Sequence, residues 1–282
     1  MKHFYVIANM KKSGVEESLS EILSKIRQAG GTAAVSEHTG RDVNGRYTNS
    51  REVPSDTECV ITLGGDGTIL QAARDLCTLG LPIFGINLGR VGFLAETERA
   101  DICAAMEALL RDQYCIEERM MLQGEIRRCG QLLHEDVSLN DIVLHADARS
   151  RVISFDFYVN NALLKTYQAD GMIIATPTGS TAYNLSAGGP IVMPVSRMIL
   201  ATPLNPHTLI SRSIVLPPDV EVKLVVGERE VSSYIVSMDS TSFSDLLPGD
   251  EIIIRISSLH ASLIKLRQDS FLDILKKKLE TS

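Results

Sequence analysis

The sequence Cys59-Val60-Ile61-Thr62-Leu63-Gly64-Gly65-Asp66-Gly67-Thr68 joins a short apolar run to a turn that contains three glycines and one carboxylate. Residues 69–79 follow with the apolar spacing of a helix, and residues 81–86 form a second apolar run. Strand, helix and strand at this spacing predict a βαβ unit, in which a helix connects two parallel strands. The stretch therefore predicts an α/β domain built on a parallel sheet.

The segments on either side of this unit extend the same domain. Residues 4–8 and 33–35 are short apolar runs that predict strands, and residues 15–29 and 100–110 have the apolar spacing of helices. We therefore expect residues 1–118 to form an α/β domain with a Rossmann-like parallel sheet.

After about residue 119 the apolar period changes from helical to two. Residues 154–159 and 220–226 alternate apolar and polar side chains, and Asn160-Asn161 and Pro248-Gly249 are typical turn pairs. This pattern predicts a β-rich, sandwich-type C-terminal domain over residues 119–258. We expect residues 259–282 to pack back on the N-terminal domain.

Composition limits the classes of partner. The 282 residues carry a formal net charge of −7, which disfavours broad binding to nucleic acid or to anionic lipid. No apolar run approaches the roughly 20 residues of a membrane helix. The five cysteines are scattered and lack metal-ligand spacing, so the sequence predicts a cytoplasmic protein with reduced thiols and no metal-binding residues.

The turn around Asp66 has the chemistry of phosphoryl transfer. Gly64, Gly65 and Gly67 would permit positive φ and close approach of a phosphate, which Thr68 and the start of the helix could also bind. A carboxylate would repel that phosphate unless it binds a metal or accepts a proton from the attacking hydroxyl. The alternative is that Asp66 merely caps the helix and that the glycines form a tight turn.

Three further segments carry polar groups suited to a nucleotide. Residues 85–93 form a second glycine-rich turn that ends in Phe93, whose ring could contact a base or could belong to the core. Asn140-Asp141 places an amide and a carboxylate at the start of a strand, where the pair could hold adenine and a ribose diol or simply form a turn. Residues 170–190 run from a buried strand into a Thr/Ser/Gly turn and a short helix. Tyr183 in this segment could stack on a ring or pack inside.

Taken together, these segments resemble the NAD kinase family in their order and spacing. The resemblance rests on residues 64–68, 91–96, 140–141 and 170–190, with residues 206–209 and Arg212 as a further matching segment. The glycine turn alone also occurs in diacylglycerol kinases, sphingosine kinases and phosphofructokinases, whereas the long run up to Pro190 distinguishes the family.

The resemblance implies an enzyme that transfers the terminal phosphoryl group of ATP, or of another donor, to the 2′-hydroxyl of the adenosine ribose of NAD. It implies that residues 1–118 are a phosphate-binding kinase domain with a phosphofructokinase-like fold and that residues 119–258 are the NAD-binding domain. It also implies a divalent cation, Mg²⁺, and a homodimer or homotetramer in which NAD lies between the domains. Asp66 would be the base, and Gly64, Gly65, Gly67 and Thr68 would bind phosphate. The remaining NAD-binding positions implied are Phe93, Asn140, Asp141, Arg151, Asp170, Thr181, Ala182, Tyr183 and Ser186, with Asp66 and Gly67.

Two other functions fit parts of the sequence. A lipid kinase on the same N-terminal scaffold would need membrane association and an apolar slot, which the acidic composition and the Thr/Ser-rich run disfavour. A non-catalytic NAD-binding regulator would keep the nucleotide pocket but would need no triphosphate.

Overall fold

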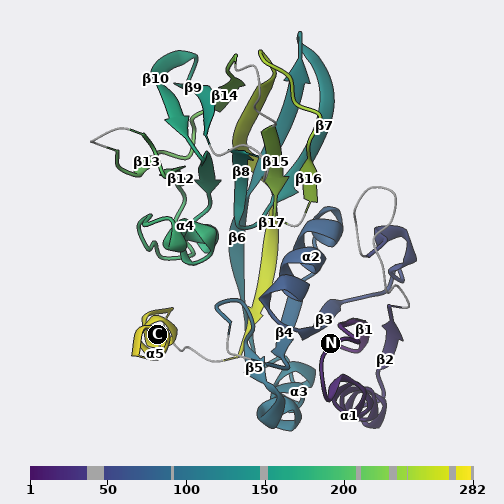
Figure 1. The fold of residues 1–282 in the computed structure, drawn as a ribbon. Coiled ribbons are helices and arrows are strands. Elements are labelled where there is room, and N and C mark those ends of the chain that lie inside the picture. The colour runs from purple at the N-terminus through teal and green to yellow at the C-terminus, as the bar shows by residue number, and fades with distance from the viewer. Residues whose placement is uncertain are drawn as a thin grey trace. The chain divides into compact units, whose positions relative to one another are not determined.

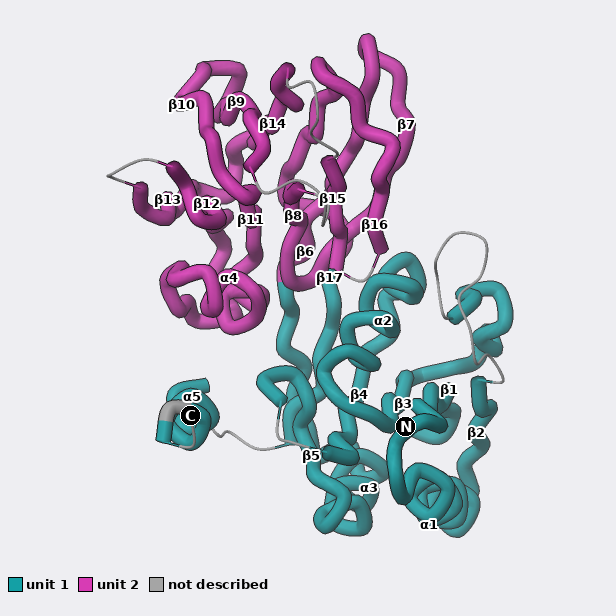
Figure 2. Tube along the Cα trace, viewed as in Figure 1, with its two compact units in different colours: residues 1–119, 260–282 teal, residues 120–259 magenta. Residues whose placement is uncertain are grey.

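The chain folds into two units in a computed structural model, which describes residues 1–36, 48–89, 92–146, 152–207, 211–228, 234–239, 241–266 and 271–280. Unit 1 comprises residues 1–119 and 260–282, and unit 2 comprises residues 120–259 (Figure 2). Two long strands, β6 (Cys115–Arg128) and β17 (Glu251–Lys265), contain the points at which the chain passes from one unit to the other. None of the helices in these described ranges is long and apolar enough to cross a bilayer.

The remaining elements of unit 1 alternate strand and helix along the chain (Figure 1). They are β1 (His3–Ala8), α1 (Val15–Gln28), β2 (Thr32–Val35), β3 (Cys59–Gly64), α2 (Asp66–Leu76), β4 (Ile83–Asn87), β5 (Thr97–Glu98), α3 (Ile102–Leu110) and α5 (Phe271–Glu280), with 3₁₀ turns at Ser50–Glu52, Cys77–Leu79 and Arg99–Asp101.

Unit 1 is built on parallel strands in the order β2-β1-β3-β4. Every residue of β3 and β4 is buried, as expected for strands covered on both faces. One face, which includes Ile61 and Phe84, packs against apolar side chains of α1 and α3. The opposite face carries Gly85, and the side chain of Ile69 from α2 lies directly over it. The glycine turn and Asp66 therefore sit where β3 ends and α2 begins.

Unit 2 consists almost entirely of antiparallel strands. In addition to parts of β6 and β17 it contains β7 (Gln131–Ser138), β8 (Asp141–Ala146), β9 (Ile153–Val159), β10 (Ala162–Ala169), β11 (Gly171–Ala175), β12 (Ile199–Leu204), β13 (Ile214–Leu216), β14 (Val222–Val226), β15 (Tyr234–Met238) and β16 (Thr241–Phe243), with a 3₁₀ turn (Thr178–Thr181) and the short helix α4 (Tyr183–Ser186).

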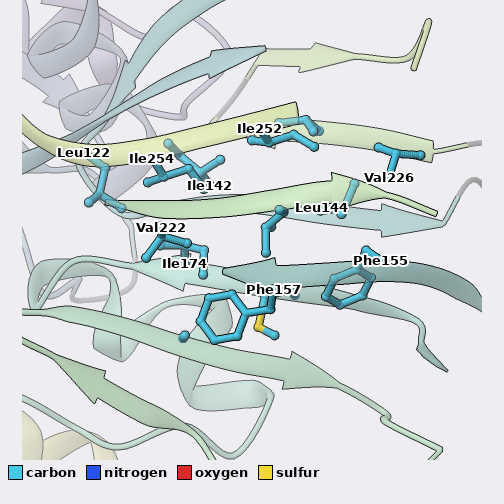
Figure 3. Packing of buried hydrophobic residues seen from close by; sticks show 14 of the residues in the cluster. Leu122, Ile142, Leu144, Phe155, Phe157, Ile174, Val222, Val226, Ile252 and Ile254 are labelled. Atoms are coloured by element: carbon cyan, nitrogen blue, oxygen red, sulfur yellow. The ribbon is translucent and has the colours of Figure 1, made fainter. Parts of the chain in front are cut away.

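Two sheets enclose the core of unit 2. One has the order β13-β12-β11-β8-β15-β16, and the other includes β10-β9-β14-β17. Phe155, Phe157 and Val222 from the second sheet pack against Leu144 and Ile174 from the first (Figure 3). The period-two pattern thus produces two inner faces, and the sandwich-type prediction is confirmed.

The backbone dihedral angles at the predicted turns explain why these residue types occur there. Asn160 and Asn161 both have positive φ, 49° and 64°, which suits a two-residue hairpin between β9 and β10. Gly249 has a φ of 85° and donates its N–H to Val226. The helix after the glycine turn begins at Asp66, earlier than the apolar spacing from residue 69 indicated, because its first three residues, Asp66, Gly67 and Thr68, carry no large apolar side chain.

Candidate functional site

The glycine turn joins the buried strand β3 to α2. Among its glycines, Gly64, Gly65 and Gly67 all have φ outside the positive range, so the prediction that they adopt positive φ is wrong. Their role is spatial instead. A β-carbon at Gly64 would lie 2.1 Å from the hydroxyl of Thr68, whereas a β-carbon at Gly65 or Gly67 would meet nothing within 4 Å. The turn therefore leaves open space beside the first N–H groups of α2, which suits an anion.

The side chain of Asp66 turns away from its own helix. Its Oδ2 accepts a hydrogen bond from the N–H of Phe93 at 2.8 Å, and Oδ1 accepts from Leu94 and Ala95 at 3.3 and 3.4 Å. The N-cap of α2 is Gly65, and no side chain caps this helix. The alternative in which Asp66 merely caps the helix is therefore wrong.

Gly92 permits this approach of the second glycine-rich segment to Asp66. A β-carbon at Gly92 would lie 1.8 Å from Oδ1 of Asp66 and 2.3 Å from the carboxyl carbon. The sequence alone does not indicate Gly92 as a site residue, because glycine is required here by the contact with Asp66, which lies 26 residues earlier in the chain.

Phe93 is half-buried within unit 1. Its ring centroid lies 6.0 Å from that of Phe271, and the ammonium of Lys278 lies 4.7 Å from the ring centroid. Phe271 and Lys278 both belong to α5, so the Phe93 ring packs against this helix. Part of the Phe93 surface remains exposed.

In unit 2, Asn140 and Asp141 are held by a carboxylate that the sequence did not reveal. Asp239 accepts backbone N–H groups from Leu139 at 2.7 Å, Asn140 at 3.0 Å and Asp141 at 3.1 Å. Asp239 has a φ of 48° in the turn that follows β15. Three amides are satisfied by one charged group, which fixes the backbone of the Asn140-Asp141 turn.

The same turn is tied to the Thr/Ser/Gly segment. The N–H of Thr176 donates to the Asn140 carbonyl at 2.9 Å, and the Thr176 hydroxyl donates to the Leu139 carbonyl at 2.6 Å. A β-carbon at Gly179 would lie 2.1 Å from the Asn140 carbonyl oxygen. The structure therefore brings together two motifs that are separated by more than 30 residues in the sequence.

Asp141 is a buried carboxyl with a displaced pKa. Burial, and secondarily the charge of Asp239, raises its pKa from 3.8 to about 7. The group can thus exchange a proton near neutral pH, and a partner that donates hydrogen bonds to it would favour its ionised form.

The short helix of the Thr/Ser/Gly segment is anchored by Asn184. This fully buried amide donates to the carbonyls of Ser180 and Pro190 and accepts a hydrogen bond from the hydroxyl of Thr202 at 2.7 Å. Thr181 and Ala182 are half-buried, whereas Tyr183 and Ser186 are exposed. The interpretation in which Tyr183 packs inside is therefore wrong, since 49% of its surface is exposed.

Asp170 lies at the other end of β11. Its Oδ2 accepts a hydrogen bond from the amide of Asn205 at 2.9 Å, and Asn205 has a φ of 41°. Asn205, like Asp239, is a supporting residue that no local motif indicated. Arg151, the remaining sequence-predicted position, lies outside the described residues.

The described residues do not supply a complete protein cage for a divalent cation. Within the ranges that the structure describes, no group of three or more His, Cys, Asp or Glu side chains lies together. Mg²⁺ commonly binds through one or two carboxylates plus substrate phosphates. The Asp66 carboxylate together with the phosphate oxygens of a substrate would be a donor set of that kind.

A carboxylate beside open space at the start of a helix is an arrangement suited to phosphoryl transfer, and comparison with known proteins gives the family. The models of the ATP-NAD kinase N-terminal and C-terminal domains match residues 4–114 and 139–266. A NAD kinase of Agathobacter rectalis is 42% identical over 282 residues, covering 99% of each chain. One of Lachnospira eligens is 38% identical over 293 residues, covering 99% of this chain and all of the relative. The chain belongs to the NAD kinase family, whose members are phosphotransferases.

Solved structures share the fold. A yeast NADH kinase, solved with NADH, is similar with a TM-score of 0.88 at 24% identity, covering 99% of this chain and 88% of the other. A NAD kinase from Archaeoglobus fulgidus, solved with ATP, has a TM-score of 0.76 at 21% identity, covering 99% of both chains. At these identities the likeness establishes the architecture.

Proposed function

We propose that this chain transfers the terminal phosphoryl group of ATP to the 2′-hydroxyl of the adenosine ribose of NAD, giving NADP and ADP. The observation that carries the proposal is the Asp66 carboxylate, held at the start of α2 beside the open positions of Gly65 and Gly67. Membership of the NAD kinase family supports the choice of substrates.

Asp66 is the proposed general base. An ionised carboxylate has about four lone-pair positions, and amides of residues 93–95 occupy three of them. The remaining position is available to accept the proton of the ribose hydroxyl as that oxygen attacks the phosphorus atom. A base within hydrogen-bond reach typically contributes about 10²–10⁴-fold to the rate.

The NAD-binding roles fall mainly on unit 2. Asn140 would bind the adenine edge, and Asp141 would accept hydrogen bonds from ribose hydroxyls in its ionised form. Asp170 and Ala182 would contact the nicotinamide end. Thr181, Tyr183 and Ser186, with Phe93 and Arg151, complete the proposed set. The proposal is supported by hydrogen bonds within unit 2, because Asp239, Thr176 and Asn184 fix the backbone that carries several of these groups.

The donor is proposed to be ATP with its bound Mg²⁺. The open space at Gly65 and Gly67, next to Gly64 and Thr68, would receive phosphate oxygens at the N–H groups of α2. Mg²⁺ bound to those oxygens would reduce the negative charge that Asp66 and the attacking hydroxyl meet.

We also propose that the enzyme is a cytoplasmic homodimer or homotetramer. Around α4, unit 2 exposes the apolar side chains of Tyr183, Leu185, Met193 and Val195, of which 36–55% is accessible. Clustered exposed apolar groups are typical of association surfaces. Light scattering on the purified protein distinguishes these states from a monomer. The scattered free cysteines are consistent with a reducing compartment.

The decisive assay mixes the purified chain with NAD, ATP and Mg²⁺ and measures NADP. Asp66→Asn should lower kcat by at least ~10²-fold while calorimetry still detects NAD binding. Asp56→Asn, at an exposed carboxylate of the same unit, is the matched control and should retain normal turnover. Near-normal kcat in Asp66→Asn would remove the assigned role.

Absence of NADP with every donor, including polyphosphate, would instead indicate a binding protein without kinase activity. Labelled vesicles and diacylglycerol in place of NAD test the lipid-kinase alternative. Phosphorylation of the lipid, with none of NAD, would overturn the proposed acceptor.

A further inference from the structure

The segment between β4 and β5 carries the three amides that bind Asp66. In this segment Gly92 lies against the carboxylate, and Glu96 is the last residue before β5. The N–H of Glu96 donates to the Gly85 carbonyl of β4 at 3.0 Å. The backbone is thus fixed to the sheet directly after the residues that hold Asp66.

The side chain of Glu96 adds a second attachment. Its Oε1 accepts the N–H of Leu266 at 3.0 Å, and its Oε2 lies 2.9 Å from the ammonium of Lys265. Only 8% of the Glu96 side chain and 12% of the Lys265 side chain are exposed. Breaking a pair this deeply buried leaves an uncompensated charge and is strongly unfavourable. Glu96 therefore joins the Asp66-binding segment to the end of β17, which lies beside β4 in unit 1 (Figure 1).

We propose that Glu96 is a positioning residue for the phosphoryl transfer, which sets the orientation of Asp66 through the amides of residues 93–95. This inference rests on the proposed function of Asp66 as the base. In this proposal Glu96 acts through Asp66, and no contact with either substrate is assigned to it.

The bond lengths explain why a distant side chain should matter. The hydrogen bonds from Leu94 and Ala95 to Asp66 are already long, at 3.3 and 3.4 Å, so displacement by a few tenths of an ångström would lose them. The carboxylate would then rotate among several orientations. A displacement of a catalytic group by about 1 Å lowers the reaction rate by as much as ~10²-fold.

Glu96→Gln is the principal test. The amide oxygen keeps an acceptor for Leu266, while the attraction to Lys265 is lost. We expect kcat to fall about tenfold and the KM for NAD to stay within about twofold. Glu107→Gln is the matched control, because it breaks a 2.9 Å ion pair with Lys25 elsewhere in unit 1 and should leave both constants unchanged.

A double-mutant cycle separates positioning from general weakening. If Glu96 acts through Asp66, then adding Glu96→Gln to Asp66→Asn should cause no further loss of the residual turnover. Equal losses in both backgrounds would overturn the proposal. If Glu96→Gln does not fold, Lys265→Met is the second variant, which keeps the Glu96 bond to Leu266 and should give a smaller, equally non-additive loss.

Hydrogen exchange gives a readout that does not depend on catalysis. Amides of residues 93–95 should exchange faster in Glu96→Gln than in the native chain, while amides of β3 keep their rates. Unchanged exchange at residues 93–95 would contradict the proposal even if kcat fell. If the native chain made no NADP, the proposed function would fail, and this exchange experiment would still decide whether Glu96 orders the segment.

Discussion

Replacement of Asp141 by Asn should stabilise unit 2 in a pH-dependent way. The folded chain raises the pKa of this carboxyl from 3.8 to about 7, because the group is buried and lies near Asp239. At pH values between 3.8 and about 7, the Asp141 carboxyl is mainly ionised in the unfolded chain and mainly protonated in the folded chain. Ionisation of Asp141 therefore lowers the stability of the native protein as pH rises from about 4 to 7, and adds no further loss above that range.

The size of the effect follows from the pKa difference. At about 1.4 kcal/mol per pH unit, the raised pKa costs about 2 kcal/mol at pH 5, where the folded carboxyl is still mainly protonated, and about 4 kcal/mol at pH 8, where it is ionised, relative to an unfolded chain with the ordinary pKa of 3.8. Asp141→Asn has a similar shape and no proton to lose. Its stability advantage over the native chain should therefore grow by about 2 kcal/mol between these two pH values.

Hydrogen exchange of the β8 amides in the ligand-free protein is the appropriate measurement, because a chain with two units need not unfold in one step. Asp219→Asn, at an exposed position in the same unit, is the control and should show no such growth. Asp239→Asn should reduce the pH effect without abolishing it, since burial is the larger cause. An Asp141→Asn advantage that is equal at pH 5 and pH 8 would refute the reasoning.

Three other outcomes follow from the structure. Gly92→Ala places a β-carbon 1.8 Å from Oδ1 of Asp66, the proposed base, and should lower kcat at least ~10-fold with NAD binding retained, as steady-state kinetics and calorimetry would show. Gly179→Ala meets the Asn140 carbonyl at 2.1 Å and should raise the KM for NAD by ~10-fold or more, and an unchanged KM would argue against Asn140 as an adenine contact. If ribose hydroxyls donate to ionised Asp141, the affinity for NAD should rise about tenfold from pH 6 to 8. Calorimetry in buffers of different ionisation heat should then detect release of a proton on binding. Asp141→Asn should abolish this pH dependence.

The parts of the fold that the sequence predicted are those governed by short-range rules. The run from residue 59 to residue 68 indicated a strand and a turn because apolar period and glycine content act locally. The alternation around Phe155 and Phe157 likewise indicated a strand with one buried face. The positive-φ expectation for Gly64, Gly65 and Gly67 failed because glycine is also required where a neighbour or a ligand needs the space of a side chain, and composition does not separate these causes.

The supporting residues could not be predicted in this way. Asp239 binds amides 98–100 residues earlier in the chain, and Glu96 binds an amide 170 residues later. Asp239 has no neighbouring motif. Glu96 ends the segment 91–96, but nothing local indicates its distant partner, and each residue is a common surface type when considered alone. The motif residues themselves were visible because phosphate and nucleotide chemistry concentrates glycine, hydroxyl and amide groups in short runs.

One physical device recurs at these positions and affects how the catalytic variant must be interpreted. Asp66 and Asp239 each accept three consecutive backbone N–H groups from a segment at the start of or just before a strand, so one carboxylate fixes the backbone there. In Asp66 the same oxygens are also the proposed base. Asp66→Asn therefore removes a proton acceptor and loosens residues 93–95 at once, and its full rate loss cannot be assigned to proton transfer. The loss in Glu96→Gln measures the contribution of loop order while the base remains, so the difference between the two losses is the better measure of what the base contributes to the chemical step.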